Sequence, residues 1–402
     1  MEIEIEQGHI QRLWTKNLIW ILSIQVMSAL AYHGYASLIP FIQSEFMLTK
    51  VEVGYMTSAM FLGSSIISIP SGVVTDRIGV RNTLTLFCLI MVGVLYIFLF
   101  TTSYIAIIAL LVCFGVGYGG ITPATNRCIM DEFPIQNRGT AMGIKQMGVP
   151  LGVVIATFIL PLMAHHYSWN ISLFVIGNIL LLVSLAYFLK NQRDIKVDFA
   201  VDNPYAKLKE ALLNKKVIVL GIVVSFYICV QVSVTTFIVI YLYQSIKFSL
   251  FVSTLCLGLV YCGGVLGRGI WGYISDNFFN RQRKKILTFI GIFSGFMLAL
   301  LGFVNGMMPV VVVCVLSFLL GFTTQGWNGI FMMMLSESAK KSDVGLTSGV
   351  GLTITNFGAI LGTPLAGLIV DLSGSYQIMW WSLAVILTGV SLLTNFLNIE
   401  NN

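Results

Sequence analysis

Long runs of apolar residues, separated by short polar connections, constrain this chain more than any other feature. Each run is close to the roughly 20 residues that a helix needs to cross ~30 Å of hydrocarbon. A bilayer core admits only helices or closed barrels, because backbone polar groups find no water there. The apolar residues are consecutive and do not alternate, which favours helices over barrel strands. We therefore predict an all-α membrane protein with twelve transmembrane helices, at roughly 18–42, 51–75, 82–101, 104–129, 140–163, 170–190, 217–243, 250–274, 285–305, 309–335, 345–370 and 376–397.

The scarcity of charge supports the same conclusion. Charged residues make up 10% of the chain, whereas a soluble domain has about 25% because its surface must be hydrated. The outer surface is therefore predicted to face lipid. The seven cysteines all fall inside apolar runs without metal-ligand spacing, which indicates small core residues. We expect no metal and no cofactor.

The basic residues predict the orientation in the membrane. With the N-terminus in the cytoplasm, only Lys50 and Lys247 fall in external loops, while Arg127, Lys145 and Arg268 fall inside spans. All other Lys and Arg residues are then cytoplasmic, as the positive-inside rule requires. We predict a multi-pass protein of the cytoplasmic (plasma or inner) membrane with both termini in the cytoplasm. The net charge of +6 follows from this rule and needs no nucleic-acid partner.

An internal repeat divides the chain into halves. The pattern Gly72-x-x-x-Asp76 after the second span returns as Gly272-x-x-x-Asp276 after the eighth. Glycines of spans four and five recur 206 residues later in spans ten and eleven. Two such halves form a transporter architecture. The sequence predicts two pseudo-symmetric six-helix bundles, residues 1–190 and 217–402, joined by a charged cytoplasmic linker at 191–216.

At these motifs the chain resembles the major facilitator superfamily over essentially its whole length. The stretch Gly72-x-x-x-Asp76-Arg77-x-Gly79-x-Arg81 is similar to that superfamily's signature loop between helices two and three. The resemblance implies the two-bundle fold and transport by alternating access. Gating is expected at the two copies of this motif, which contain Gly72, Asp76, Arg77, Gly79, Arg81 and Asp276.

Two narrower resemblances concern the transported substrate. The stretch from Asn126-Arg127 to Gly143 is similar to the anion:cation symporter branch, in which the arginine at the position of Arg127 is implicated in contacting the substrate carboxylate. The stretch from Gly267-Arg268 to Asp276 is similar to helix eight of oxalate and monocarboxylate carriers, where the matching arginine pairs with the anionic substrate. Both imply a small, carboxylate-like organic anion as cargo.

The chain departs from that branch in its first helix and in its acidic residues. It has His33 and no Arg or Lys in the first span, and none of its 17 acidic residues falls near the middle of a span. A buried carboxylate is therefore not expected to carry a coupling proton. His33, which lies between Tyr32 and Tyr35, is the candidate proton site because imidazole titrates near neutral pH; a hydrogen-bonded core histidine is the alternative.

Cations inside spans are costly unless they face a wet cavity or a partner. Arg268 lies two turns deeper than Asp276, and it could bind substrate or form an interhelical ion pair. Arg127 could bind substrate, pair with Asp76 or Asp131, or extend toward the headgroups. Lys145 could bind substrate or extend toward the headgroups. The remaining candidate substrate-binding residues are polar or amphipathic groups of the spans, for which hydrogen bonding between helices is an equally good explanation: His33, Tyr32, Tyr35, Gln146, Gln231, Tyr241, Trp327, Asn328 and Asn356.

Glycine serves packing in this sequence. The glycines between Gly143 and Gly152, and those between Gly358 and Gly367, are predicted to allow close helix packing. Gly72 is expected to permit a close helix approach at the signature loop. Asp76 is expected to cap a helix dipole or pair with a cation at the cytoplasmic gate.

These patterns predict a secondary active transporter for a small organic anion, which acts as a monomer. No phosphate-binding loop, catalytic triad or metal cluster is visible, so we do not expect an enzyme. The driving force could be a proton gradient, exchange, or the substrate's own gradient. A proton-coupled exporter of drugs or metabolites such as a siderophore is the main alternative, and a receptor that has lost transport is a third.

Overall fold

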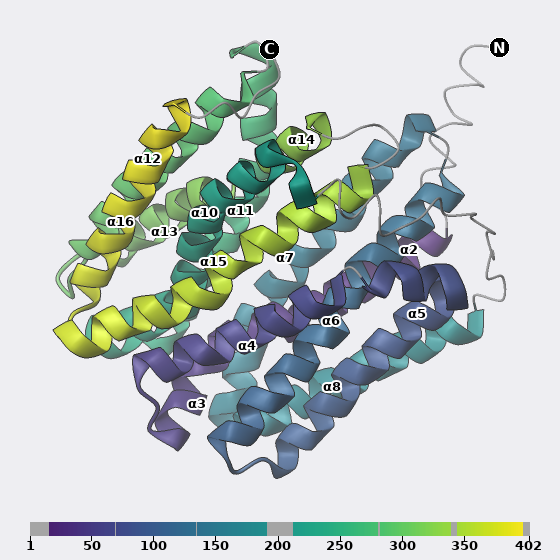
Figure 1. Ribbon diagram of the computed structural model, residues 1–402. Coiled ribbons are helices and arrows are strands. Elements are labelled where there is room, and N and C mark those ends of the chain that lie inside the picture. The colour runs from purple at the N-terminus through teal and green to yellow at the C-terminus, as the bar shows by residue number, and fades with distance from the viewer. Residues whose placement is uncertain are drawn as a thin grey trace. The chain divides into compact units, whose positions relative to one another are not determined.

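In the computed structural model, described here for residues 16–68, 70–133, 135–190, 212–279, 282–338 and 344–396, every regular element is a helix (Figure 1). The first part of the chain forms α2 (Lys16–Gly34), η1 (Tyr35–Leu38), α3 (Ile39–Phe46), α4 (Lys50–Ser68), α5 (Pro70–Ile97), η2 (Phe98–Phe100), α6 (Tyr104–Glu132), α7 (Ile135–His166) and α8 (Trp169–Lys190). The second part forms α10 (Lys215–Ile240), η3 (Tyr241–Ser245), α11 (Leu250–Asn277), α12 (Arg283–Gly302), α13 (Val310–Thr324), α14 (Trp327–Glu337), α15 (Val344–Ser373), α16 (Tyr376–Leu393) and η4 (Thr394–Phe396).

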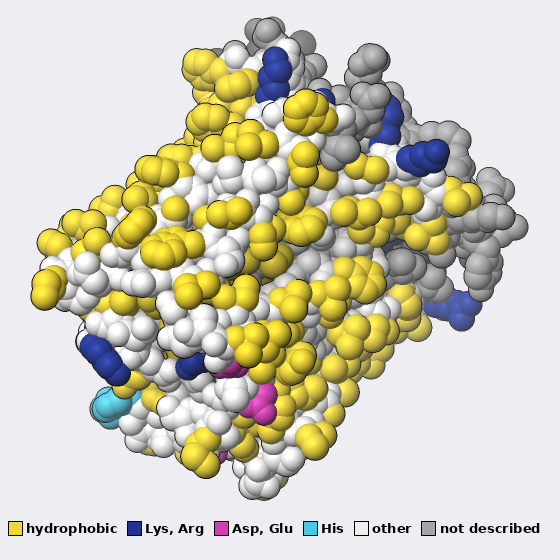
Figure 2. Space-filling model, turned by 60° about the vertical axis from the view of Figure 1, so that its left-hand side comes forward, with side chains coloured by type: hydrophobic (Ala, Val, Ile, Leu, Met, Phe, Trp, Pro, Cys, Tyr) yellow, Lys and Arg dark blue, Asp and Glu magenta, His cyan; other side chains and the backbone are white. Residues whose placement is uncertain are grey.

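Eleven of the described helical segments are long and apolar enough to cross a membrane. The helix α4, at the predicted second span, is not among them, and it begins with the charged Lys50 and Glu52. Large apolar side chains such as Leu182, Val311 and Val385 are exposed on these helices. Figure 2 shows hydrophobic side chains over much of the visible surface and only a few basic or acidic ones. An apolar outer surface of this extent is suited to lipid.

The chain forms two compact units. The first consists of Met1–Tyr35 and Gly63–Phe199, and the second of Ala36–Leu62 and Ala200–Asn402. The segment 36–62, which contains α3 and most of α4, therefore packs with helices that follow it by more than 150 residues. The division into halves at 190 and 217 stays a prediction. Residues 191–211, which make up most of the predicted linker, lie outside the described part of the chain.

The internal repeat is visible in the packing of each unit. In the first unit α2 packs on α7 and α5 on α8; in the second α10 packs on α15 and α12 on α16. Equivalent glycines allow equivalent contacts, since a Cβ on any of them would overlap a backbone carbonyl of the neighbouring helix. The four pairs are Gly63 with Val112, Gly263 with Phe318, Gly152 with Val26, and Gly358 with Ser225.

Three predicted boundaries need correction. The expected loop between spans two and three is a kink inside α5 at Gly79, whose φ of 83° and ψ of 163° are open mainly to glycine. The first span is interrupted by η1, and the tenth is divided between α13 and α14 at Gln325.

The start of α4 is held by the end of α15 within the second unit. The Asp371 carboxylate accepts hydrogen bonds from the backbone N–H groups of Lys50 (2.9 Å) and Val51 (2.7 Å). A carboxylate at this place satisfies free N–H groups and complements the helix dipole. The Lys50 ammonium donates to Oε1 of Gln244 at 2.9 Å and lies 5.8 Å from the centre of the Tyr376 ring. The first turn of α4 is thereby fixed to α15, η3 and α16.

The partly buried Lys50 ammonium predicts that the free energy of unfolding rises with pH. Burial lowers the pKa of Lys50 to about 8, although Asp371 acts in the opposite direction. Between about pH 8 and the ordinary lysine pKa of roughly 10.4, the folded protein then binds fewer protons than the unfolded one. Folding is therefore favoured as pH rises through this interval.

In Lys50→Met this contribution should disappear, so its thermal midpoint should gain less than that of wild type between pH 8 and pH 10. The exposed Lys247 offers a matched control, and Lys247→Met should follow wild type. Equal pH responses of Lys50→Met and wild type would contradict the assignment.

Candidate functional site

Among the described Lys and Arg side chains, Lys145 of the first unit is the most deeply buried. Its side chain is 0% exposed on α7, and its Nζ donates to Oδ1 of Asn126 on α6 at 2.5 Å. The prediction left open whether this lysine extends toward the headgroups; its complete burial and its amide partner show that it points into the unit. Gln146, the next residue, is exposed and does not share this environment.

The two arginines lie on different units. Arg127 follows Asn126 on α6 in the first unit and is half-buried. Arg268 is half-buried on α11 in the second unit, where its backbone packs against Gly329 of α14. Arg268 also lies close enough to the Tyr261 hydroxyl, two turns earlier on α11, to interact with it electrostatically. Each unit thus carries at least one cation inside a membrane-spanning helix.

His33 belongs to an aromatic cluster of the first unit. Its Nε2 lies 3.2 Å from the Tyr118 hydroxyl, and its ring meets the rings of Tyr32 and Tyr118 edge-on. Tyr32 and Tyr118 stack on each other with centroids 4.0 Å apart. Tyr35, predicted with them, is buried at the start of η1. Sequence reasoning missed Tyr118, and its setting in Gly117-Tyr118-Gly119-Gly120 is the signal that could have identified it.

In the second unit the structure brings together two of the predicted polar residues. Nδ2 of Asn328 on α14 donates to Oε1 of Gln231 on α10 at 3.1 Å. Asn356 is half-buried on α15. Gln325, at the break between α13 and α14, is buried, and its Nε2 has no hydrogen-bond partner among the described residues. The second unit therefore contains several amide side chains that are buried or half-buried.

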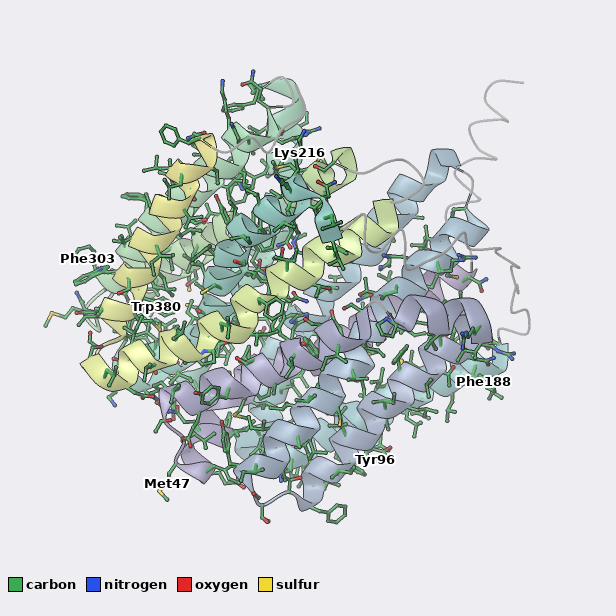
Figure 3. The ribbon with its side chains drawn as sticks, viewed as in Figure 1. Met47, Tyr96, Phe188, Lys216, Phe303 and Trp380 are labelled. Carbon is green, nitrogen blue, oxygen red and sulfur yellow. The ribbon has the colours of Figure 1, made fainter. Side chains whose placement is uncertain are left out.

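Tyr241 and Trp327 have packing environments. The Tyr241 hydroxyl donates toward the carbonyls of Leu301 and Val304, each at 3.1 Å. Its ring packs against Trp380, which Figure 3 labels. Trp327 is fully buried and donates its indole N–H to the Thr324 carbonyl at 2.8 Å. The polar atoms of both side chains are thus bound to backbone.

The signature stretch is described in part. Gly79 forms the kink in α5, and the guanidinium of Arg81 lies 4.7 Å from the ring centre of Phe188 on α8 (Figure 3). A Cβ on Gly72 would meet no described residue within 4 Å, and the close helix approach expected there stays a prediction. Arg77 is exposed. The side chains of Asp76 and Asp276 lie outside what the structure describes.

No three His, Cys, Asp or Glu side chains gather in a metal-binding arrangement within the described ranges. Within these ranges, the ionisable and amide groups named above could therefore bind a ligand through hydrogen bonds, positive charge and one imidazole.

Two helical units, with eleven apolar helices and cations inside them, define a multi-pass membrane protein. The family model described as Major Facilitator Superfamily matches residues 21–350, and the chain belongs to that family.

Relatives and solved structures agree with this assignment. The hexuronate transporter of Bacillus subtilis (strain 168) is 24% identical over 366 residues, which cover 84% of this chain and 83% of the relative. A probable galactarate/D-glucarate transporter of the same organism is 26% identical over 381 residues, covering 84% and 81%. The crystal structure of an auto-inhibited POT family peptide transporter superposes with a TM-score of 0.79 at 15% identity, covering 95% of this chain and 96% of that one, and shows the same fold.

Proposed function

We propose that this protein is a secondary carrier that moves a small organic anion across the cytoplasmic membrane by alternating access of its two units. The observation that carries the proposal is the fully buried ammonium of Lys145, which is held by the neutral amide of Asn126. The names of two relatives, a hexuronate and a galactarate/D-glucarate transporter, point to the same chemical class.

The charge balance of the spans supports an anionic cargo. A cation at the centre of a membrane helix costs on the order of 3 kcal/mol on insertion scales. The carboxylates whose side chains the structure describes, Glu45, Glu52 and Asp371, all lie close to helix ends. An anionic substrate would supply negative charge deep inside the protein, where these carboxylates do not lie.

We assign roles to the candidate residues on this basis. Lys145, Arg127 and Arg268 would each offer a positive charge to the anion. The Gln231–Asn328 pair and Asn356 would offer hydrogen bonds to neutral parts of the cargo. Tyr241 and Trp327 are assigned to packing, since their polar atoms are bound to backbone. The signature residues from Asp76 to Arg81 would govern the rate of the conformational change, and their loss should slow transport without abolishing substrate recognition.

Proton coupling would use His33. Its imidazole is bonded to the Tyr118 hydroxyl, which can accept or donate as the ring changes its protonation state. If uptake follows an imposed proton gradient, His33→Ala should flatten the pH dependence between about pH 5 and pH 8. Uptake that depends only on anion loaded inside the vesicles would instead identify an exchanger.

The proposal is tested by transport with purified protein in proteoliposomes. Labelled galacturonate and galactarate should enter, and unlabelled organic anions should compete, whereas neutral galactose should not. Lys145→Met should fold and lose most of this uptake. A wild-type protein that binds none of the anions, or that confers resistance to apolar drugs when expressed, would contradict the assignment and favour an exporter. Labelling of a cysteine placed in the 191–216 linker from either side tests the cytoplasmic orientation.

A further inference from the structure

Gln25 is a buried polar side chain that the fold itself does not use. It lies on α2, is 0% exposed, and neither its Nε2 nor its Oε1 has a hydrogen-bond partner among the described residues. An unpaired buried amide destabilises a protein, and an apolar residue of similar shape would avoid this cost. A polar group kept in such a place calls for a partner that is bound only part of the time.

Gln25 lies beside the helix face that carries Lys145. A Cβ on Gly148 of α7 would come within 3.1 Å of Cβ and 3.2 Å of Cγ of Gln25. Gly148 follows Lys145 by three residues, so both lie on the same face of α7, about 5–6 Å apart. The Gln25 side chain therefore meets α7 about one helical turn from the position of Lys145.

Lys145 has unused hydrogen-bonding capacity in the same place. Its ammonium has three N–H groups, and within the described residues its one hydrogen bond is to Asn126. A buried cation with free donors and a buried amide with a free donor and a free acceptor thus lie on neighbouring helices, about one helical turn apart along α7. On α2, Leu18 lies two turns before Gln25, in a hydrophobic cluster with Ile129, and Tyr32 lies two turns after it, stacked on Phe114.

We infer that Gln25, Asn126 and Lys145 form the part of the cargo site that recognises a carboxylate with a hydroxyl group on the adjacent carbon. The inference rests on the proposed anion transport. The ammonium of Lys145 binds a carboxylate oxygen, with Asn126 as the residue that positions it. The Gln25 amide binds the neighbouring hydroxyl, which can both donate and accept and so matches its two unpaired atoms. Gly148 is required because it leaves room for the Gln25 side chain.

The test compares D-gluconate with 2-deoxy-D-gluconate, which differ only in the hydroxyl on C2. Binding to purified wild-type protein should favour gluconate by tenfold or more, since a site built to hydrogen-bond a hydroxyl rejects the analogue that lacks it. In Gln25→Leu this preference should vanish, through weaker binding of gluconate with unchanged binding of the 2-deoxy compound. Lys145→Met should bind neither compound.

Stability separates a binding role from a packing role. Without ligand, Gln25→Leu should melt at the same temperature as wild type or higher, because it removes an unpaired buried amide. Ser28→Ala is the matched control. Ser28 is equally buried on α2, but its hydroxyl donates to the backbone carbonyl of Gln25 at 3.2 Å, and the variant should keep the preference. As a second variant, Gly148→Ala should weaken the preference by pressing on the Gln25 side chain.

These experiments distinguish the role of Gln25 from the proposed anion transport. If wild type transports organic anions but does not distinguish gluconate from its 2-deoxy analogue, the role of Gln25 is overturned and anion transport stands. The role is likewise overturned if Gln25→Leu keeps the wild-type preference. If wild type transports no anion of the panel, the proposed function itself fails.

Discussion

Replacing Arg268 by lysine should greatly reduce substrate binding although the positive charge is conserved. A planar guanidinium can hold a carboxylate through two parallel hydrogen bonds, and a lysine ammonium cannot reproduce this geometry. Arg268 is half-buried on α11, inside a membrane-spanning segment, where such a pair is poorly hydrated. Loss of one hydrogen bond to a charged group costs about 1.5–3 kcal/mol, so the affinity of Arg268→Lys should fall by roughly tenfold or more.

Arg268→Ala should be affected more strongly, by about 2–5 kcal/mol, because truncation leaves the anion without its charge partner. Isothermal titration of galactarate into purified protein measures both variants. Arg283→Lys is the matched control: Arg283 is buried at the start of α12 and donates to the Ser275 hydroxyl at 2.8 Å, so its replacement should lower stability and leave affinity unchanged. If Arg268→Lys and Arg268→Ala fold normally and bind as tightly as wild type, Arg268 is structural.

Alanine at Gly152 or Gly358 should destabilise the protein strongly. A Cβ at either position would overlap a backbone carbonyl, of Val26 on α2 or of Ser225 on α10, and a backbone atom cannot move aside as a flexible side chain can. The helices of each pair would have to separate. Overpacking of this kind costs about 1–3 kcal/mol or more, which exceeds the gain of up to about 1 kcal/mol from the higher helix propensity of alanine.

The chain offers controls for the propensity effect. Gly93 on α5 and Gly389 on α16 lie inside helices where a Cβ would meet nothing within 4 Å. Gly93→Ala and Gly389→Ala should therefore be as stable as wild type or slightly more stable. Thermal melting of the four purified variants compares them directly, and a Gly152→Ala protein as stable as Gly93→Ala would show that the close packing of α2 on α7 is not needed.

Part of the site could be predicted from residue type and position alone. Lys145 and Arg268 were identified because a cation in an apolar run is costly. This cost is evident from the sequence and does not depend on which helices pack nearby. His33 was identified because imidazole titrates near neutral pH and no acidic residue falls near the middle of a predicted span. The family assignment confirmed the resemblance carried by the signature stretch at Gly72–Arg81 and by the repeat.

Other members of the site depend on contacts between helices. Gln25 has no distinguishing neighbours in sequence, while Asn126 precedes Arg127 and Tyr118 lies among glycines. All three matter because α2, α6 and α7 bring them near Lys145 or His33. Glycines also differ in their surroundings, since a Cβ on Gly152 would overlap the Val26 carbonyl and a Cβ on Gly72 would meet no described residue within 4 Å. For Tyr241 and Trp327 the sequence left substrate binding and hydrogen bonding between helices open, and the tertiary structure gives their polar atoms backbone partners.

The sequence by itself determined that this chain is a bundle of membrane helices in two related halves, because hydrophobic length and periodic glycines are properties of the chain read in order. Only the tertiary structure decided which polar groups meet. Asp371 binds the first turn of α4 more than 300 residues away, and Lys145 binds Asn126 on another helix. Such pairs are fixed by the rotation and register of each helix against its neighbours, which depend on the packing of all of them together.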